Sequence, residues 1–237
     1  IQNQLTSLFT HAAKIYDLPV NPCKKVKRMG NSDSRSLNFW TLDEYKQFIQ
    51  TMEPGTRYYL IFEMLFWTGC RIGELLAITK ADINFEKNQL SINKTYYRTG
   101  MQDIITEPKT KQSFRTIEIP EFLKEEIKEF VDGHYGMPDT ERLFPVVQEA
   151  VQHKMKRQIE LAGVKKIRVH DLRHSHVAYL IEKGVEPLLI RDRLGHKDIR
   201  ITLNTYGHLY PNQQRKIANL LDNENAVTGL GEERDEC

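Results

Sequence analysis

Six residues with phosphate-binding or proton-transferring side chains occur in short, distinctive settings between positions 71 and 206, and their convergence would fix most of the fold. The settings are G-C-R-I-G-E-L-L, P-K-T-K, H-D-L-R-H, L-G-H and N-T-Y-G, and the six residues are Arg71, Lys109, His170, Arg173, His196 and Tyr206. These side chains supply what a metal-independent attack of a tyrosine on a phosphodiester needs. A chain that uses them has to fold so that distant segments meet at one phosphate.

The two arginines are the candidates for binding that phosphate. When an oxygen attacks a phosphodiester, negative charge accumulates on the two non-bridging oxygens of the five-coordinate transition state. A guanidinium stays charged at physiological pH and presents parallel N–H donors that match phosphate oxygens. Arg71 and Arg173 are therefore interpreted as a clamp, in which each preorganised donor typically contributes about 100- to 1000-fold in rate.

Tyr206 is the candidate nucleophile, and its attack needs two proton transfers. A free phenol has a pKa of about 10, so ionising it at pH 7 costs roughly 4 kcal/mol. His170 can accept the phenol proton, and Lys109 can donate a proton to the departing 5′ oxygen. His196 would add a hydrogen bond to the phosphate, and Glu74 can hold a neighbouring arginine or histidine in place.

From about residue 42 to residue 210 the chain resembles the catalytic domain of a tyrosine recombinase, in the phage and integrative-element integrase branch. The resemblance rests on T-G-C-R-I-G-E-L, P-K-T-K-x-S-x-R-T-I, H-D-L-R-H, L-G-H and N-T-Y, and no member of the expected set is missing. It implies a mostly α-helical domain with a small antiparallel three-stranded β-sheet. It also implies these roles: phosphate binding by Arg71 and Arg173, general acid catalysis by Lys109, assistance by His170 and His196, and a transient 3′-phosphotyrosyl bond at Tyr206.

The same resemblance implies a site-specific DNA recombinase (integrase) that integrates or excises a mobile element or prophage. Its partners would be double-stranded DNA attachment sites and three further copies of the chain, as a homotetramer in the synaptic complex and a monomer alone. An accessory excision factor or a host DNA-bending factor is compatible with this assignment. No cofactor, metal or ATP is expected, because the phosphotyrosyl bond conserves the energy of the broken linkage. Further DNA-binding candidates are Lys24, Lys25, Lys27, Arg28 and Lys111.

Several alternatives stand beside this interpretation. Lys111 is a rival for the general acid, although Lys109, directly before Thr110, matches the family's β-hairpin lysine better. A type IB topoisomerase shares the catalytic set. A DNA-binding module without catalysis would need the basic residues but has no use for Tyr206.

A zinc hydrolase is disfavoured by the chemistry of the histidine-rich segment. His170 and His174 have the helical spacing of H-E-x-x-H zinc sites. Asp171 replaces the glutamate, however, and Arg173 between the histidines would repel a dication, so no metal site is expected. For His174 and His176 the expected role is packing or hydrogen bonding to the backbone.

Charge and cysteine content agree with a DNA-acting, cytoplasmic protein without identifying one. The net charge of +2 combines a tail, residues 222–237, of six acids and one base (−5) with a body of +7. A basic body is compatible with phosphate binding. Three cysteines at positions 23, 70 and 237 have no metal-ligand spacing, which favours a reducing compartment.

The sequence divides into three predicted parts. Residues 1–35 are interpreted as the last helix of a core-binding domain plus a basic linker, residues 36–221 as the catalytic domain, and residues 222–237 as an acidic, flexible tail. Helices are predicted over residues 2–16, 57–68, 72–77, 121–131, 146–162, 170–183 and 187–194, with another that starts at a capping box, Thr41 and Glu44. Strands are predicted over residues 90–97 and 115–119, with Lys109 in the hairpin between them. An amphipathic helix over residues 213–221 is expected to dock on a neighbouring subunit.

Overall fold

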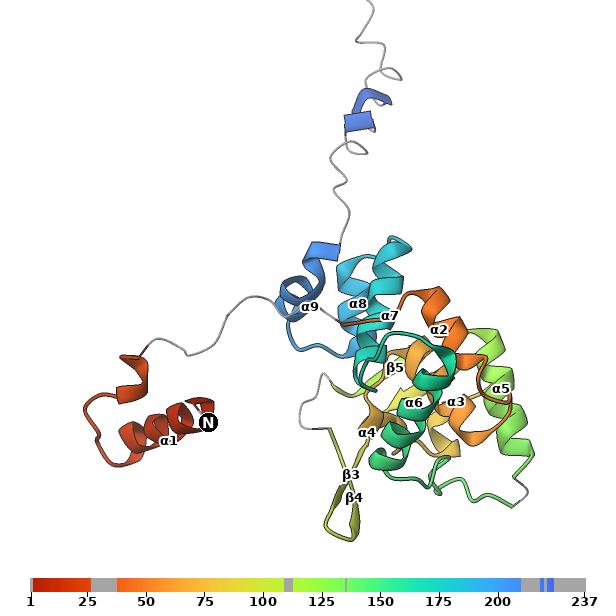
Figure 1. Cartoon of the computed structure of the whole chain (residues 1–237), viewed down its shortest axis with the longest axis horizontal. Coiled ribbons are helices and arrows are strands. Elements are labelled where there is room, and N and C mark those ends of the chain that lie inside the picture. The colour runs from red at the N-terminus through yellow and green to blue at the C-terminus, as the bar shows by residue number, and fades with distance from the viewer. Residues whose placement is uncertain are drawn as a thin grey trace, which may run out of the picture. The chain divides into compact units, whose positions relative to one another are not determined.

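The computed structural model describes residues 2–26, 38–108, 113–134, 136–209, 218–219 and 221–223. The chain divides into two compact units, Ile1–Leu37 and Asn38–Cys237 (Figure 1). The first unit contains helix α1 (Gln2–Ile15) and the 3-10 helix η1 (Pro22–Lys24). Asn21 connects them, because its amide nitrogen donates to the Thr6 carbonyl and to the Thr10 hydroxyl. The division lies beside the predicted boundary, and the assignment of the first piece to a core-binding domain stays a prediction.

Helices make up most of the second unit, as expected for the predicted fold class. Their bounds are α2 (Leu42–Ile49), α3 (Arg57–Thr68), α4 (Ile72–Leu75), α5 (Glu121–Asp132), α6 (Gln148–Ala162), α7 (Asp171–Glu182), α8 (Pro187–Leu194) and α9 (Ile199–Tyr206), with the 3-10 helices η2 (Lys80–Asp82) and η4 (Gly207–Leu209). The predicted capping box at the start of α2 is present, since Glu44 and Thr41 bond each other's backbone N–H groups.

Helix α3 runs through the centre of this unit and is buried on nearly every face. Its residues from Leu60 to Phe66 are all buried, and all of them except Glu63 are apolar, as expected for a central helix. Aromatic rings from α2 pack against it: Tyr45 stacks on Phe66 with ring centroids 3.7 Å apart, and Phe48 meets Phe62 edge-on at 5.1 Å. This core holds the segments that carry the site.

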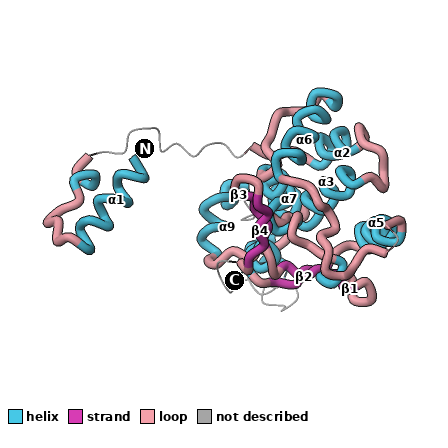
Figure 2. Tube along the Cα trace, turned by 90° about the horizontal axis from the view of Figure 1, so that it is seen from below, coloured by secondary structure: helices cyan, strands magenta, loops and turns pink. Residues whose placement is uncertain are grey.

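The short strands form two small sheets, whose strands are magenta in Figure 2. Strands β1 (Ile83–Asn84), β2 (Gln89–Ile92) and β5 (Arg115–Glu118) form the predicted three-stranded antiparallel sheet in the order β1-β2-β5. The strands β3 (Thr95–Thr99) and β4 (Gln102–Thr106) pair in a separate two-stranded sheet.

The prediction of one continuous strand over residues 90–97 was wrong. The strand breaks at Asn93 and Lys94 because both side chains turn to the buried carboxylate of Asp82. The Asn93 amide donates at 2.8 Å, and the Lys94 ammonium lies 2.6 Å from the other carboxylate oxygen. The chain therefore leaves the three-stranded sheet after β2 and enters the β3–β4 hairpin.

The β3–β4 hairpin was not predicted, although one signal for it is present. Gly100 and Met101 form a two-residue loop between Thr99 and Gln102, and Gly100 adopts a φ of 61°. Two-residue hairpin loops need positive φ, which glycine supplies without steric cost. Strand β4 carries little hydrophobic alternation because nearly all of it is exposed.

Candidate functional site

A glycine turn between α3 and α4 places Arg71 at the site. Gly69 ends α3 with a φ of 66°, and a Cβ added there would lie 2.5 Å from the His176 ring, so only glycine fits. Arg71 then becomes the N-cap of α4. Glu74, in the first turn of α4, accepts from the Arg71 backbone N–H at 2.9 Å and from its Nη1 at 2.8 Å. Glu74 therefore contacts an arginine, as the sequence analysis expected, and its role in the site stays a prediction.

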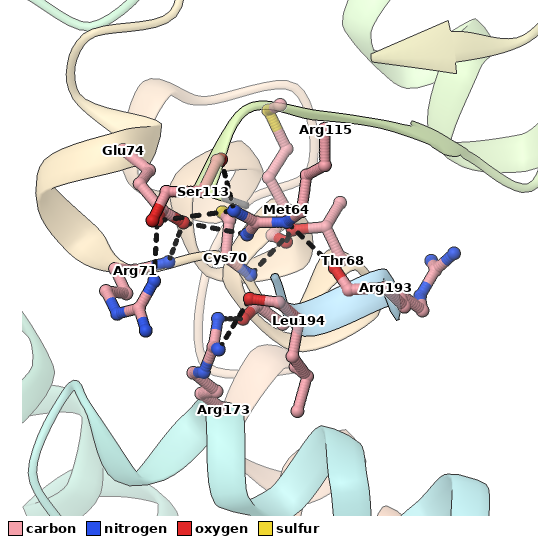
Figure 3. A network of polar contacts seen from close by, with 11 residues as sticks. Met64, Thr68, Cys70, Arg71, Glu74, Ser113, Arg115, Arg173, Arg193 and Leu194 are labelled. Carbon is pink, nitrogen blue, oxygen red and sulfur yellow. Dashed lines mark hydrogen bonds and ion pairs between the residues drawn. The ribbon is translucent and has the colours of Figure 1, made fainter. Parts of the chain in front are cut away.

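Arg173 reaches the same place from α7, with its guanidinium almost completely buried. Its Nη1 donates to the Gly69 carbonyl and its Nη2 to the Leu194 carbonyl, both at 2.8 Å (Figure 3). Burial first, and then the charge of Arg71, lower the pKa of Arg173 below the usual arginine value. The predicted phosphate clamp thus has two arms: Arg71 is held by Glu74, and Arg173 is held by the carbonyls of Gly69 and Leu194.

A third arginine that the sequence analysis did not select, Arg115 at the start of β5, completes this network. Its Nη2 and Nη1 donate to the two Glu74 carboxylate oxygens at 2.8 and 3.3 Å, and its side chain is 5% exposed. Burial alone would raise the pKa of Glu74, but the bonds and charges of Arg115 and Arg71 lower it to about 2. Glu74 is therefore ionised, and two cations neutralise it.

His170 and His196 flank the clamp from two different helix ends. His170 is the N-cap of α7, and His196 follows Gly195, which ends α8 with a φ of 66°. The Nδ1 of His196 lies 2.9 Å from the Thr202 hydroxyl. Burial, with the charges of Arg173 and Arg71, lowers the pKa of His196 to about 4. Burial and the charge of Arg173 also lower the pKa of His170. Both imidazoles are therefore neutral at pH 7.

Tyr206 is the last residue of α9 and is 2% exposed. Its hydroxyl lies 2.6 Å from Nδ1 of His174 on α7. Burial raises the pKa of Tyr206 to about 12, although the charges of Arg173 and Arg71 act in the opposite direction. The phenol is thus neutral in this conformation, and it lies within the electrostatic reach of both clamp arginines.

The partner of Tyr206 differs from the one that the sequence suggested. His174 was expected to pack or to bond the backbone; its ring does pack against Tyr206, but its Nδ1 contacts the phenol oxygen and not a backbone group. Its ring also meets the ring of His170 edge-on, with centroids 5.3 Å apart. Burial, and next the charge of His170, lower the pKa of His174. The i,i+4 spacing on α7 placed both rings on one face, which was the available signal.

A pocket of about 640 Å³ opens beside His170, between α4 and α6. Its walls include apolar side chains such as Met155 and Val169, and its cationic side chains are Lys156, Lys166 and Arg168. Arg168 also pairs with the buried Asp171 at 2.7 Å, which ties the segment before α7 to the first turn of that helix. Positive side chains next to the clamp suit a polyanion that extends beyond a single phosphate.

Several predicted site residues lie outside this cluster. Lys109 and Lys111, and likewise Lys27 and Arg28, fall outside the residues that the structure describes. Lys24 and Lys25 are exposed in the first unit. Their assignments stay predictions.

Within the described ranges, no group of three or more histidine, cysteine, aspartate or glutamate side chains could hold a metal ion. His176 is buried, and its Nε2 accepts from Arg193 at 3.1 Å. Among those same ranges no helix has both the length and the apolar character needed to cross a membrane.

Comparison with known sequences identifies the family. The sequence model of the phage integrase family matches residues 38–213. The chain is 31% identical over 239 residues to the ICEBs1 integrase of Bacillus subtilis (strain 168), covering 92% of this chain and 65% of that protein. It is 28% identical over 253 residues to a XerC-like tyrosine recombinase of Caldanaerobacter subterraneus subsp. tengcongensis, covering 94% and 64%. The chain therefore spans about two thirds of the length of these curated relatives.

Solved structures share the fold. The Tn1549 transposon integrase in complex with a circular intermediate DNA superposes with a TM-score of 0.75 at 20% identity, over 94% of this chain and 77% of that one. XerA recombinase superposes with a TM-score of 0.60 at 22% identity, over 88% and 70%. At these identities the likeness concerns the arrangement of helices and strands.

Proposed function

The chain belongs to the phage integrase family of tyrosine recombinases, and from that premise we propose that it cleaves and rejoins DNA at specific sites through a phosphotyrosyl intermediate at Tyr206. The reaction integrates or excises a mobile element or prophage and uses neither metal nor ATP. The observation that carries the proposal is the buried phenol of Tyr206, hydrogen-bonded to His174 and within the field of Arg71 and Arg173.

In the proposed cleavage step the Tyr206 oxygen attacks the scissile phosphorus, and the bond from phosphorus to the 5′ oxygen breaks. Arg71 and Arg173 stabilise the charge that develops on the non-bridging oxygens, and His196 adds a hydrogen bond to them. Lys109 gives a proton to the leaving 5′ oxygen. The reverse reaction, with a 5′ hydroxyl from the partner strand, forms the recombinant linkage.

The proton of Tyr206 needs an acceptor, and His174 is the one in contact with it. A neutral imidazole has one unprotonated nitrogen, and at 2.6 Å the Nδ1 of His174 can accept from a protonated phenol. His170 then acts from the phosphate side, since Arg173 and Arg71 both influence its pKa. Replacing the acceptor should lower the cleavage rate about 100-fold or more. His174→Ala and His170→Ala, compared in single-turnover cleavage, separate the two: the larger rate loss at constant DNA affinity marks the proton acceptor.

We further propose that double-stranded attachment-site DNA is the substrate, and that four copies assemble in the synaptic complex while the free protein is a monomer. The family supports this assembly, and the basic side chains beside His170 support contact with DNA. An accessory excision factor or host DNA-bending factor would set the direction of the reaction. Gel filtration that finds only monomers with and without attachment-site DNA would contradict the assembly.

A nicked suicide duplex tests the catalytic proposal, because the nick lets the 5′-hydroxyl fragment diffuse away and traps the covalent intermediate. The duplex is made from the junction of the element that carries the gene. Wild-type protein should shift to a covalent species on a denaturing gel. Tyr206→Phe should keep DNA affinity and form none. Tyr179→Phe, which removes a hydroxyl from half-buried Tyr179 on α7, is the matched control and should react as the wild type does. A Tyr206→Phe variant that still forms the covalent species would refute the assignment.

A further inference from the structure

We propose that Arg115 is a positioning residue that joins the two arms of the phosphate clamp. The inference rests on the recombinase function proposed above and goes beyond the six residues of the catalytic set. Arg115 lies on β5, whereas the two clamp arginines lie on α4 and α7. Figure 3 shows its guanidinium between Glu74 on one side and the end of α8 on the other.

The first arm depends on Arg115 through Glu74. An ionised carboxylate has about four acceptor positions. The Arg71 backbone N–H and side chain occupy two of those of Glu74, and the forked donors of Arg115 occupy two. Bidentate pairing fixes the carboxylate plane as well as its position. The orientation in which Glu74 presents itself to Arg71 is therefore set from the opposite side by Arg115.

The second arm depends on Arg115 through the end of α8. The last carbonyls of a helix have no intrahelical partner and carry partial negative charge. Arg115 Nε donates to the Arg193 carbonyl at 2.8 Å, and Arg173 Nη2 donates to the next carbonyl, that of Leu194, also at 2.8 Å. Because these two acceptors are consecutive, a shift of the α8 end moves Arg173 with it.

The geometry assigns positioning and not phosphate binding to Arg115. Its side chain is 5% exposed, and its donors are directed to protein acceptors. Its Nη1 also lies 3.3 Å from the carbonyl of Ser113, at the end of the segment that follows Lys109. A substitution of Arg115 should therefore slow the chemical step and leave DNA affinity nearly unchanged, because misplacement of about 1 Å can cost about 100-fold in rate.

Arg115→Gln in the intact protein tests this, with single-turnover cleavage of the nicked junction duplex and DNA affinity measured side by side. We expect cleavage about 100-fold slower than in the wild type, with the dissociation constant within about threefold. We also expect a new pH dependence. In the wild type Glu74 is ionised over the whole pH range of the assay. Without Arg115, only Arg71 counteracts the effect of burial, so the pKa of Glu74 rises. Cleavage by Arg115→Gln should then fall more steeply than that of the wild type as pH is lowered from about 8 to about 5.

Two further variants separate positioning from general stability. Arg115→Lys keeps the charge beside Glu74 but loses the fork, so it should be about 10-fold slower without the added pH dependence. Arg142→Gln is the matched control, since Arg142 is 14% exposed and donates to the Leu76 and Val146 carbonyls without contacting Glu74. It should lower the melting temperature and leave the pH profile unchanged.

The outcomes separate this inference from the proposed function. If the wild type forms no covalent complex with DNA, both the proposed function and the positioning role of Arg115 are overturned. If the wild type reacts and Arg115→Gln matches its rate and pH profile, the positioning role alone is overturned. Should Arg115→Gln fail to unfold cooperatively, Arg115→Lys decides: a folded lysine variant that cleaves at the wild-type rate overturns the inference.

Discussion

Two buried glutamates in this molecule have pKa values that are shifted in opposite directions. Glu63 on α3 and Glu74 on α4 are each 5% exposed. Glu63 accepts hydrogen bonds from the Tyr45 hydroxyl and the Trp67 indole, both at 2.8 Å, and burial raises its pKa to about 7. Glu74 also loses solvation, but two arginines lower its pKa to about 2. Neutral donors satisfy the first carboxyl, and only cations keep the second one ionised.

The difference shows how the partners of a buried carboxyl group determine its charge. The core around Glu63 tolerates a carboxyl because that group can bind a proton. Next to the proposed phosphate site an uncompensated carboxylate would repel the substrate, whereas Glu74 with Arg71 and Arg115 forms a cationic, preorganised group. The two glutamates are therefore buried to a similar extent, but they differ in their partners. Glu63, with neutral donors, belongs to the hydrophobic core, and Glu74, with arginines, belongs to the candidate site.

The largest expected loss of cleavage rate comes from a substitution in the arginine clamp. Arg173→Lys keeps a charge but loses the planar guanidinium, whose separate nitrogens reach the Gly69 and Leu194 carbonyls and leave further donors for phosphate. We expect cleavage to fall by about 100- to 1000-fold. Glu63→Gln, on the core side, should cleave at the wild-type rate. Equal losses in the two variants would show that the regions are not functionally distinct.

A smaller loss is expected when Glu74 itself becomes neutral. Glu74→Gln keeps the shape but leaves Arg71 and Arg115 without the carboxylate that holds them, so Arg71 loses its orientation. Cleavage should slow by about 10- to 100-fold while DNA affinity stays similar or rises, because one negative charge is removed. Single-turnover rates and binding isotherms measure the two quantities. A Glu74→Gln variant with wild-type rates would contradict the positioning of Arg71 by Glu74.

The pH dependence of stability should have opposite signs in the two regions. The pKa of Glu63 is raised, so the folded state holds its proton between about pH 4.5 and 7, and stability contributed there is lost as pH rises through that window. The loss amounts to about 3 kcal/mol at most. The pKa of Glu74 is lowered, so its contribution is present above about pH 4.5 and is lost as pH falls toward 2.

Denaturant unfolding across pH measures this difference. Relative to the wild type, Glu63→Gln should gain stability as pH rises from about 5 to 8, and Glu74→Gln should gain as pH falls below about 4.5. Slopes of the same sign for both variants would contradict the contrast between the two carboxyls.

The smallest expected effect is on stability, from removing one of the neutral hydrogen-bond donors to Glu63. Tyr45→Phe removes one hydrogen bond to Glu63 and should cost about 1 kcal/mol, or about 2–4 °C in melting temperature for a chain of this size. Because that bond lowers the pKa of Glu63, its loss should raise this pKa further. Tyr179→Phe is again the control. No change in melting temperature with Tyr45→Phe would mean that the bond contributes little.

Sequence reasoning selected Arg71 and Arg173, which the structure brings into one polar network, because both stand in motifs whose local setting is specific. It also located α3 and its end at Gly69, where a long apolar run meets a glycine. Arg115 stands in the motif P-K-T-K-x-S-x-R-T-I but was given no role, because its partners Glu74 and Arg193 are 41 and 78 positions away and the motif does not show such pairing. His174 was passed over because a histidine on a helix is more often structural.

The β3–β4 hairpin shows the same limit for the fold. Its strands are short and mostly exposed, so hydrophobic alternation is weak. The break after Ile92 depends on Asp82, which lies 11 positions before Asn93, outside the predicted strand, and binds Asn93 and Lys94 only in the folded chain. A local sequence pattern predicts helices and strands that bury one face. Elements that are mostly exposed, such as the β3–β4 hairpin, depend on polar contacts that form only in the folded chain.

The most direct test of the account is to identify the residue and the DNA end that are joined. Covalent complex trapped on the nicked duplex is digested with protease and nuclease, and the nucleotide-bearing peptide is sequenced by mass spectrometry. We predict a 3′-phosphate linked to Tyr206. A linkage to Tyr210 or to any other residue, or to a 5′-phosphate, would contradict the claim that the clamp of Arg71 and Arg173 serves Tyr206.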